Sequence, residues 1–372
     1  MGKRYLLVGG AGFIGSHLAD ELLRHGHEVR IYDSLVPQVH GRQDIWPSYL
    51  SAEVERLVGD VRDVGSLTRA LAGVDGVFHL AARVGVGQSM YEIEDYVAAN
   101  ELGTATLLQL LSRRPVERLV VASSMSIYGE GLYRDAEGKA IIPSLRTAAQ
   151  LAAQRWEPLD RDGRPLEPVP TPEHKTPDLA SVYALSKYAQ ERMCLIVGDA
   201  YGIETVALRL FNVFGSRQAL SNPYTGVLAI FAARLLNGRR PAVFEDGRQR
   251  RDFVHVKDVA QAFHLAMTTP RACRQVINVG SGRAYAVAEV AHLLAGALGR
   301  PELTPEITGR ARTGDIRHCF ADISRARELL GFAPSHQLET ALDELVGWLD
   351  GQRAEDRVGE ATAELERRGL VA

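Results

Sequence analysis

Residues 5–15 read YLLVGGAGFIG, and the fold follows from this stretch. The apolar run 5–8 predicts a short buried strand, and the amphipathic segment 13–25 predicts a helix. Between and within them stand Gly9, Gly12 and Gly15. Glycine allows a tight turn at the first position, removes a side chain at the second, and lets helix and strand pack closely at the third. The free N–H groups at the start of such a helix suit phosphate, so the stretch indicates a dinucleotide site.

More apolar runs follow the same plan along the chain, at 28–32, 54–58, 76–80, 117–122 and 205–210. Runs with little polar alternation are typical of strands covered on both faces, and the segments between them predict crossover helices. We therefore expect an α/β fold with a Rossmann-type doubly wound parallel sheet. The sheet would lie in a dinucleotide-binding domain at residues 1–212. A smaller, mixed α/β C-terminal lobe at 213–372 would bind substrate, with a segment near 250–270 returning to the first domain.

Two segments depart from this alternation. Residues 131–180 are rich in proline and charge and predict a long irregular loop inserted into the first domain. A lid over the site, a decorative insertion and a dimer contact are all open interpretations. The tail beyond Gly351 is charged and poor in apolar residues, which predicts a frayed helix or a disordered segment. Further helices are expected at 182–197, 227–237, 256–268 and 287–298.

The composition narrows the class of partner. The 372 residues carry a formal net charge of −3, with both signs spread along the chain, which argues against nucleic acid or an anionic membrane as a partner. No apolar stretch is long enough to span a bilayer and no signal peptide stands at the start, so we expect a cytoplasmic protein. The cysteines are far apart in sequence and predict buried, reduced thiols rather than a disulfide framework or a metal site: Cys194, Cys273 and Cys319.

Two aspartates follow strands at the edge where a dinucleotide would bind. Asp33 ends the second expected strand, where a carboxylate can accept hydrogen bonds from the adenosine ribose hydroxyls and repel a 2′-phosphate. This placement favours NAD over NADP, although a simple turn residue is the alternative. Asp60 follows the third strand and is either an adenine contact or a turn aspartate.

Tyr183 and Lys187 stand four residues apart, on one face of the expected helix 182–197. A neighbouring ammonium and an oxidised nicotinamide both favour the phenolate, so they lower the pKa of tyrosine from about 10 toward neutrality. The phenol can then accept a proton from an alcohol. Ser124 follows the strand 117–122, where its hydroxyl would hydrogen-bond the reacting oxygen. Alone, the Tyr–Lys pair is typical of a solvated helix face, and His79 is typical of a packed strand residue rather than a base.

Several motifs together resemble the extended short-chain dehydrogenase/reductase family of sugar-nucleotide epimerases and dehydratases. They are GGAGFIG (9–15), FHLAA (78–82), SSMSIYG (123–129), YALSK (183–187), RLFNVFG (209–215), RDFVHVKDV (251–259) and RTGD (312–315). The resemblance implies NAD as cofactor, a nucleotide sugar as substrate and no metal. It implies Ser124, Tyr183 and Lys187 as the catalytic residues. The implied NAD contacts are Gly9, Gly12, Phe13, Ile14, Gly15, Asp33, Asp60, Val61, Leu80, Ala81, Ala82, Asn100, Tyr183 and Lys187. The implied substrate contacts are Ser124, Met125, Ser126, Tyr183, Asn212, Val227, Arg251, Arg312 and Asp315.

The residues after the serine distinguish the reactions of this family. Its 4,6-dehydratases and decarboxylases carry acidic residues there, whereas this chain has Met125 and Ser126. The resemblance therefore favours a 4-epimerase, which oxidises C4 and returns hydride to the opposite face. Residues 222–256 resemble bacterial dTDP-L-rhamnose 4-epimerases, which form dTDP-6-deoxy-L-talose; Met125 or Val84 would then face the sugar methyl group. The alternatives are a UDP-glucose or UDP-hexosamine 4-epimerase, a 4-ketoreductase, a 4,6-dehydratase, a decarboxylase and a non-catalytic NAD sensor.

By analogy with this family we also expect a homodimer. The helix that carries Tyr183 and one spanning roughly 96–111 would pair with their symmetry mates in a four-helix interface. The apolar residues of the second helix permit this pairing and equally permit packing on the sheet: Val97, Leu102, Leu107 and Leu110.

Overall fold

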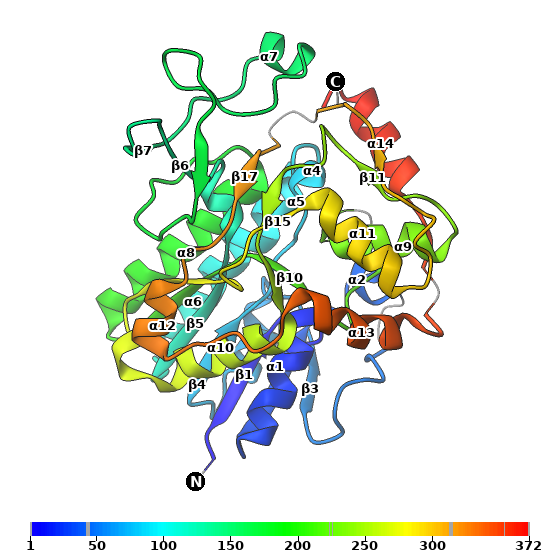
Figure 1. The fold of residues 1–372 in the computed structure, drawn as a ribbon. Coiled ribbons are helices and arrows are strands. Elements are labelled where there is room, and N and C mark those ends of the chain that lie inside the picture. Colours follow the sequence, from blue (N-terminus) through cyan, green and yellow to red (C-terminus); the bar gives the residue numbers. More distant parts are fainter. Residues whose placement is uncertain are drawn as a thin grey trace.

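The computed structural model describes residues 2–41, 45–222, 224, 226–311, 315–352 and 354–370. Its centre is a parallel sheet of seven strands, in the order β14-β9-β5-β4-β1-β2-β3 (Figure 1). The sheet grows from β1 in both directions, so β1 and β4 are neighbours where the winding reverses. This is the doubly wound plan that the sequence predicts, in which ligands bind at that point. The strands are β1 (Arg4–Val8), β2 (Glu28–Asp33), β3 (Glu55–Val58), β4 (Gly76–His79), β5 (Arg118–Ser124), β9 (Glu204–Leu210) and β14 (Val276–Val279).

The edge strand β14 was not expected in this sheet. It pairs in parallel with β9, from Val276 opposite Ala207 to Val279 opposite Leu210. The sequence predicts a return of the chain to the first domain near 250–270, but not the strand that follows it at Val276–Val279. The other six strands lie close to the apolar runs that predict them. A domain boundary at residue 212 stays a prediction.

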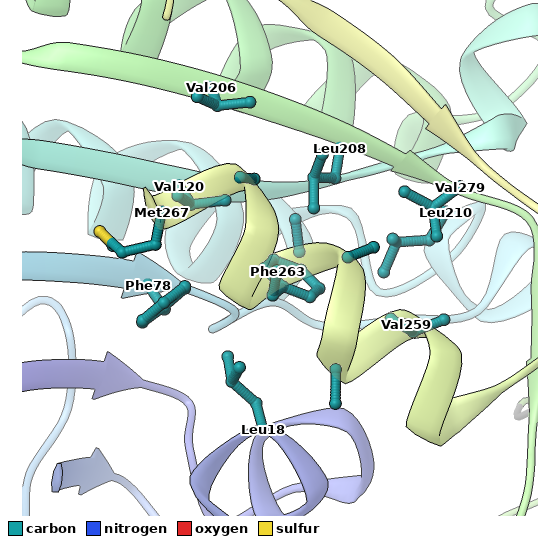
Figure 2. Close-up of a cluster of buried hydrophobic side chains, with 14 of the residues drawn as sticks. Leu18, Phe78, Val120, Val206, Leu208, Leu210, Val259, Phe263, Met267 and Val279 are labelled. Atoms are coloured by element: carbon teal, nitrogen blue, oxygen red, sulfur yellow. The ribbon is translucent and has the colours of Figure 1, made fainter. Parts of the chain in front are cut away.

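One face of the sheet is covered by α1 (Phe13–Arg24) and α10 (Val256–Thr268). Figure 2 shows Phe263 of α10 between the sheet and α1, near Phe78 of β4 and Leu18 of α1. All three side chains are fully buried. Burying a side chain of this size stabilises the fold by about 1.5–3 kcal/mol. Helix α10 therefore anchors a late part of the chain onto the first sheet.

The opposite face is covered by α3 (Val64–Ala70), α6 (Gly103–Arg113) and α8 (Val182–Tyr201). Successive residues of β1 divide between the two layers: Leu7 packs with the α1 side and Leu6 packs with the α8 side. This alternation follows from the two-residue period of a strand. The sheet is thus covered on both faces, as its apolar runs predict, except at the edge strand β3, whose residues are largely exposed.

The second lobe packs three helices around its own core: α9 (Val227–Leu236), α11 (Val287–Ala297) and α13 (Leu338–Leu349). Small sheets surround this core. The strand β10 (Asn212–Phe214) pairs with β13 (Phe253–His255), β11 (Ala242–Val243) pairs with β16 (Glu306–Ile307), and β12 (Arg250–Arg251) lies between β15 (Tyr285–Ala286) and β17 (His318–Cys319). The remaining short elements are α2 (Pro37–His40), α4 (Val86–Ser89), α5 (Ile93–Tyr96), the π-helix η1 (Val97–Leu102), the 3-10 helices η2 (Met125–Tyr128) and η3 (Pro270–Ala272), and α12 (Ser324–Leu330).

Residues 131–180 differ from the long irregular loop that the sequence predicts. They contain a three-stranded antiparallel sheet, β7-β6-β8, and the short helix α7, and Figure 1 shows them beyond the carboxyl edge of the main sheet. Pairing of these strands satisfies backbone N–H and C=O groups within the segment. The many prolines and charged residues of the segment hide the alternating pattern from which strands are predicted. The elements are β6 (Leu132–Arg134), β7 (Ala140–Ile141), α7 (Ala148–Ala152) and β8 (Glu167–Val169).

The tail forms a helix, α14 (Val358–Arg367), which is one of the two forms expected for it. Its apolar face is buried: a Cβ built on Gly87 would lie 3.4 Å from Leu365. The guanidinium of Arg368 stands 4.3 Å from the ring centre of Tyr91. Leu365 of the tail therefore packs against α4. Within the described residues, none of the helices combines the length and the hydropathy needed to cross a membrane.

Candidate active site

Two of the glycines between β1 and the first turn of α1 stand where other backbone atoms approach closely. Gly9 has φ +82°, and a Cβ there would lie 2.6 Å from the backbone nitrogen of Ala81. A Cβ on Gly15 would lie 2.6 Å from Gly10. Gly12, the N-cap of α1, is different, because a Cβ there would meet only the Gly9 carbonyl at 3.7 Å. Space in front of position 12, beside a helix N-terminus, fits the pyrophosphate of a dinucleotide.

Asp33, at the end of β2, braces this turn. Its carboxylate accepts hydrogen bonds from the backbone N–H of Ala11 at 3.0 Å and of Leu35 at 2.9 Å. His40, which the sequence analysis did not single out, places Nε2 3.7 Å from Asp33 Oδ1. Burial lowers the pKa of His40 and Asp33 opposes this. Carboxylate lone pairs remain for ribose hydroxyls, so that role of Asp33 stays a prediction.

Asp60 turns back on its own loop. Its carboxylate accepts from the Arg62 backbone N–H at 2.9 Å and from the Arg62 guanidinium at 2.9 and 2.6 Å. Hydrogen bonding to Arg62 lowers the pKa of Asp60 despite partial burial. Its neighbour Val61 is buried, and a Cβ on Gly103 would lie 2.3 Å from Val61 Cγ1, so α6 approaches closely there. Asp60 thus does the work of a turn residue, and an adenine contact stays a prediction.

Ser124 and Tyr183 come together at the carboxyl edge of the sheet. Ser124 ends β5, and its Oγ accepts from the Ser126 N–H at 3.1 Å and from the Ser126 hydroxyl at 2.9 Å. Tyr183 lies in the first turn of α8. Burial raises the pKa of Tyr183, and a hydrogen bond with the Ser124 side chain lowers it. The two hydroxyl groups that the sequence predicts to act together are therefore in contact.

Lys187 lies one turn further along α8 and is buried. Its ammonium donates to the carbonyl of Ala122 at 2.7 Å and to the side chain of Gln190. Burial lowers the pKa of Lys187 to about 8. The sequence predicts that this ammonium lowers the pKa of Tyr183, but within the chain burial dominates that pKa and raises it. An acidic phenol thus depends on the positive ring of oxidised nicotinamide, and stays a prediction.

Two serines accept hydrogen bonds from backbone N–H groups at the start of α8. The N–H of Ala184 donates to the Ser181 side chain at 3.1 Å, and the N–H of Tyr183 donates to Ser89 Oγ at 3.0 Å. Ser89 is fully buried in α4. Sequence reasoning missed it because a cap from another element leaves no local signal. The position of Tyr183 therefore depends on α4.

Behind Lys187 lies a buried polar network. Asn100, in the π-helix η1, accepts from the Arg83 N–H at 2.7 Å and donates to Ser186 Oγ at 2.9 Å. Gln190 donates to Thr104 Oγ1 at 2.9 Å, and its Nε2 lies 2.9 Å from His79 Nε2. π-Helical turns are frequent at functional sites. His79 is fully buried and burial lowers its pKa to about 3, as suits a packing residue.

The expected substrate residues are brought together only in part. Met125 is buried in the core between the main sheet and the helices α1 and α10, and Val84 is exposed. Asn212 Oδ1 is buried with no hydrogen-bond partner among the described residues, so it can accept from a ligand. Val227 begins α9, next to its Gly226 cap.

The charged residues expected at the substrate have partners within the chain where they are described. The guanidinium of Arg251 donates to the backbone carbonyls of Arg250, Ile316 and Arg317, so it orders the backbone at these residues. The carbonyl of Asp315 accepts from Arg146, a residue that the sequence analysis did not single out. Arg312 lies outside the described residues.

The comparisons with known proteins agree with this geometry. The model of the NAD dependent epimerase/dehydratase family matches residues 5–150 and 162–280. A dTDP-L-rhamnose 4-epimerase from Burkholderia thailandensis is 34% identical over 352 residues, which are 94% of this chain and 95% of the relative. A crystal structure of UDP-glucose 4-epimerase from Thermotoga maritima with UDP-glucose superposes with a TM-score of 0.75 at 28% identity, covering 94% of this chain and 99% of that one. The structure of MoeE5 with UDP-glucuronic acid and NAD gives a TM-score of 0.74 at 29% identity, with the same coverage.

The match of the family model spans the glycine turn, Ser124 and the Tyr183–Lys187 pair. It also spans Asn212 and Arg251. The protein is an enzyme and its cofactor is NAD, and the chain belongs to the NAD dependent epimerase/dehydratase family.

Proposed function

We propose that the protein is a nucleotide-sugar 4-epimerase that converts dTDP-L-rhamnose to dTDP-6-deoxy-L-talose. The observation that carries the proposal is the contact between the Ser124 and Tyr183 side chains at the carboxyl edge of the sheet, one helical turn from Lys187. The relative from Burkholderia thailandensis, which is named for this substrate, supports the choice of sugar.

The chain's own residues suit proton transfer at C4. When bound, NAD supplies the hydride acceptor and donor for that carbon. Tyr183 accepts the proton of the C4 hydroxyl and later returns it, while Ser124 hydrogen-bonds the same oxygen. Lys187 holds the ribose hydroxyls of the cofactor, and the unpaired Asn212 Oδ1 accepts from the nucleotide sugar. The glycine turn and Asp33 hold the dinucleotide.

The residues after Ser124 favour epimerisation over elimination. Met125 is buried among apolar side chains and Ser126 donates to Ser124, so neither supplies the acid that loss of water would need. Dehydratase and decarboxylase activities are accordingly disfavoured. A UDP-glucose or UDP-hexosamine 4-epimerase is the second candidate, because a UDP-glucose 4-epimerase is also similar in fold and sequence.

Incubation of the purified protein with a panel of nucleotide sugars, followed by NMR, tests both candidates. Inversion at C4 of dTDP-L-rhamnose, with no net absorbance change at the nicotinamide band, is expected. Inversion of UDP-glucose alone would select the second candidate, and net formation of reduced cofactor would select a reductase. Tyr183→Phe should abolish turnover while NAD stays bound. Turnover by that variant would exclude Tyr183 as the proton acceptor.

We also propose a homodimer formed through α8 and the neighbouring helical segment. Leu102, Leu185 and Ile196 are 57%, 50% and 59% exposed, although all three are apolar. Leu107, by contrast, is fully buried and packs on the sheet, which is the other role that the sequence left open for this helix. Light scattering tests this proposal by comparing the molar mass in solution of the Leu185→Glu variant with that of wild type. A cytoplasmic location stays a prediction.

A further inference from the structure

The segment 131–180 is joined to the second lobe by a buried cluster of charged side chains. Glu245 links two buried arginines, because its carboxylate accepts from Arg146 Nη1 at 2.7 Å and from Arg317 Nη1 at 2.9 Å. Arg317 also donates to Glu157 at 2.6 Å and to Asp246 at 2.6 Å. Buried charges are tolerated only when they are paired. The cluster therefore fixes the segment 131–180 against the second lobe.

Three consecutive carbonyls of the second lobe each accept a hydrogen bond from a guanidinium. Arg146 Nη2 donates to the Asp315 carbonyl at 2.9 Å. Arg251 donates to the Ile316 carbonyl at 2.6 Å and to the Arg317 carbonyl at 2.9 Å. The stretch 315–317 is thus held from two sides, by an arginine of the inserted segment and by one of the second lobe itself.

The N–H groups that follow are held as well. The buried carboxylate of Glu130 accepts from the Arg317 N–H at 2.6 Å and from the His318 N–H at 3.2 Å. The hydroxyl of Tyr133 donates to the same carboxylate at 2.7 Å. Charge-assisted bonds of this kind are stronger than neutral ones. The backbone from Asp315 to His318 is therefore ordered before any ligand binds.

From these contacts we infer that Arg146 is a positioning residue of the nucleotide-sugar site, an inference that rests on the proposed function. Asp315 is one of the residues implied to contact the substrate, and Arg146 holds its backbone carbonyl. Within the described part of the chain, Arg146 forms no hydrogen bond or ion pair with Ser124, Tyr183 or Lys187. A preordered stretch binds more tightly, because its ordering does not oppose binding. Loss of the Arg146 guanidinium should thus weaken substrate binding and leave the chemical step intact.

The test compares Arg146→Met with wild type as full-length protein carrying its NAD. The KM for dTDP-L-rhamnose should rise about tenfold, while kcat stays within about twofold and NAD content is unchanged. Arg164→Met is the matched control, because Arg164 lies in the same segment with its side chain 59% exposed. Its KM should equal that of wild type. An Arg146→Met protein that folds and keeps the wild-type KM would overturn the inference.

Arg146→Lys decides the matter if the methionine variant fails to fold. Lysine keeps a charge for Glu245 but lacks the second nitrogen that reaches the Asp315 carbonyl. A KM above that of wild type, with a normal melting temperature, supports positioning, because a purely structural role would change the melting temperature and not the KM. A wild-type KM in this variant overturns the inference.

Calorimetry with dTDP and UDP separates this inference from the proposed function. If wild type binds dTDP or UDP but epimerises no sugar, weaker binding by the Arg146 variants keeps the inference and rejects the proposed function. Equal binding by wild type and the variants rejects the inference whether or not the sugar turns over. A wild-type protein that binds neither nucleotide rejects both.

Discussion

The hydroxyl of Ser89 accepts a 3.0 Å hydrogen bond from the backbone N–H of Tyr183, and the same hydroxyl donates to the Val86 carbonyl at 2.6 Å. A buried serine of α4 thereby caps the helix whose first turn carries the phenol. Helix N-termini present N–H groups that need such acceptors. The placement of Tyr183 is consequently a property of two elements that are far apart in sequence.

Ser89→Ala should reduce both stability and turnover. Loss of a cap costs about 1 kcal/mol, and the phenol should lose its fixed distance to Ser124, so kcat should fall about tenfold or more. Thr147→Ala is the control, because Thr147 caps α7 through the Gln150 N–H at 3.1 Å, away from Tyr183. That variant should lose a similar stability and keep its kcat. Equal kcat values for the two variants would contradict the role given to Ser89.

Gly12→Ala and Gly9→Ala should separate cofactor binding from folding. A Cβ at position 12 meets no atom closer than 3.7 Å, so the protein should fold with an unchanged apo melting temperature. The methyl group would occupy the space of the pyrophosphate, and NAD affinity should fall more than about tenfold. Gly9→Ala should lower the apo melting temperature as well, because φ is +82° there and Ala81 lies 2.6 Å away. Normal NAD content in purified Gly12→Ala protein would count against the assigned cofactor site.

The alkaline limb of the pH–rate profile should follow Lys187. Burial lowers the pKa of this ammonium to about 8, so kcat/KM should fall as the pH rises through that value and the charge is lost. Gln190→Leu removes a carbonyl acceptor of the ammonium and should lower this pKa further, which moves the limb to lower pH. Gln190→Glu adds a carboxylate beside the ammonium and should move the limb to higher pH. Limbs that coincide in all three proteins would assign the titration to another group.

Arg209 and Glu191 should contribute strongly to stability. They form a buried pair with two parallel bonds of 2.9 and 2.8 Å. Arg209→Met leaves the Glu191 carboxylate buried without its partner, which should lower the free energy of unfolding by about 3–5 kcal/mol. Arg274→Met breaks an exposed pair with Asp199 at 3.0 Å and should cost less than about 1 kcal/mol. Denaturant unfolding of the two variants checks this contrast, which similar losses would refute.

Sequence predicted the fold where local patterns suffice. The glycine turn, the apolar strands and the helix of Tyr183 all carry their signal within a few residues, and the sheet confirms them. β14 carries no such signal, because its three apolar residues and Asn278 fit either lobe and only the tertiary path assigns them. The same limit explains why the small sheet in 131–180 was expected as a loop.

The site was predictable for residues inside motifs and not for those that support them. Ser124 and Tyr183 are in contact, as expected. Ser89 and Arg146 were missed, since each acts on a residue more than a hundred positions away or in another element. The guanidinium of Arg251 binds backbone carbonyls, and its expected contact with substrate stays a prediction. Such partners become visible only when the packed chain brings them together.

The return of α10 and β14 to the main sheet has a consequence for how this molecule can be divided. A fragment ending at residue 212 would lack the edge strand β14 and the side chain of Phe263. The apolar surface next to Phe78 would then be exposed to water. We expect that neither half folds alone, because α10 and β14 return the chain to the first sheet. We expect the protein to unfold in a single cooperative transition. Substrate specificity should therefore be changed by exchanging loops rather than by exchanging one half of the chain.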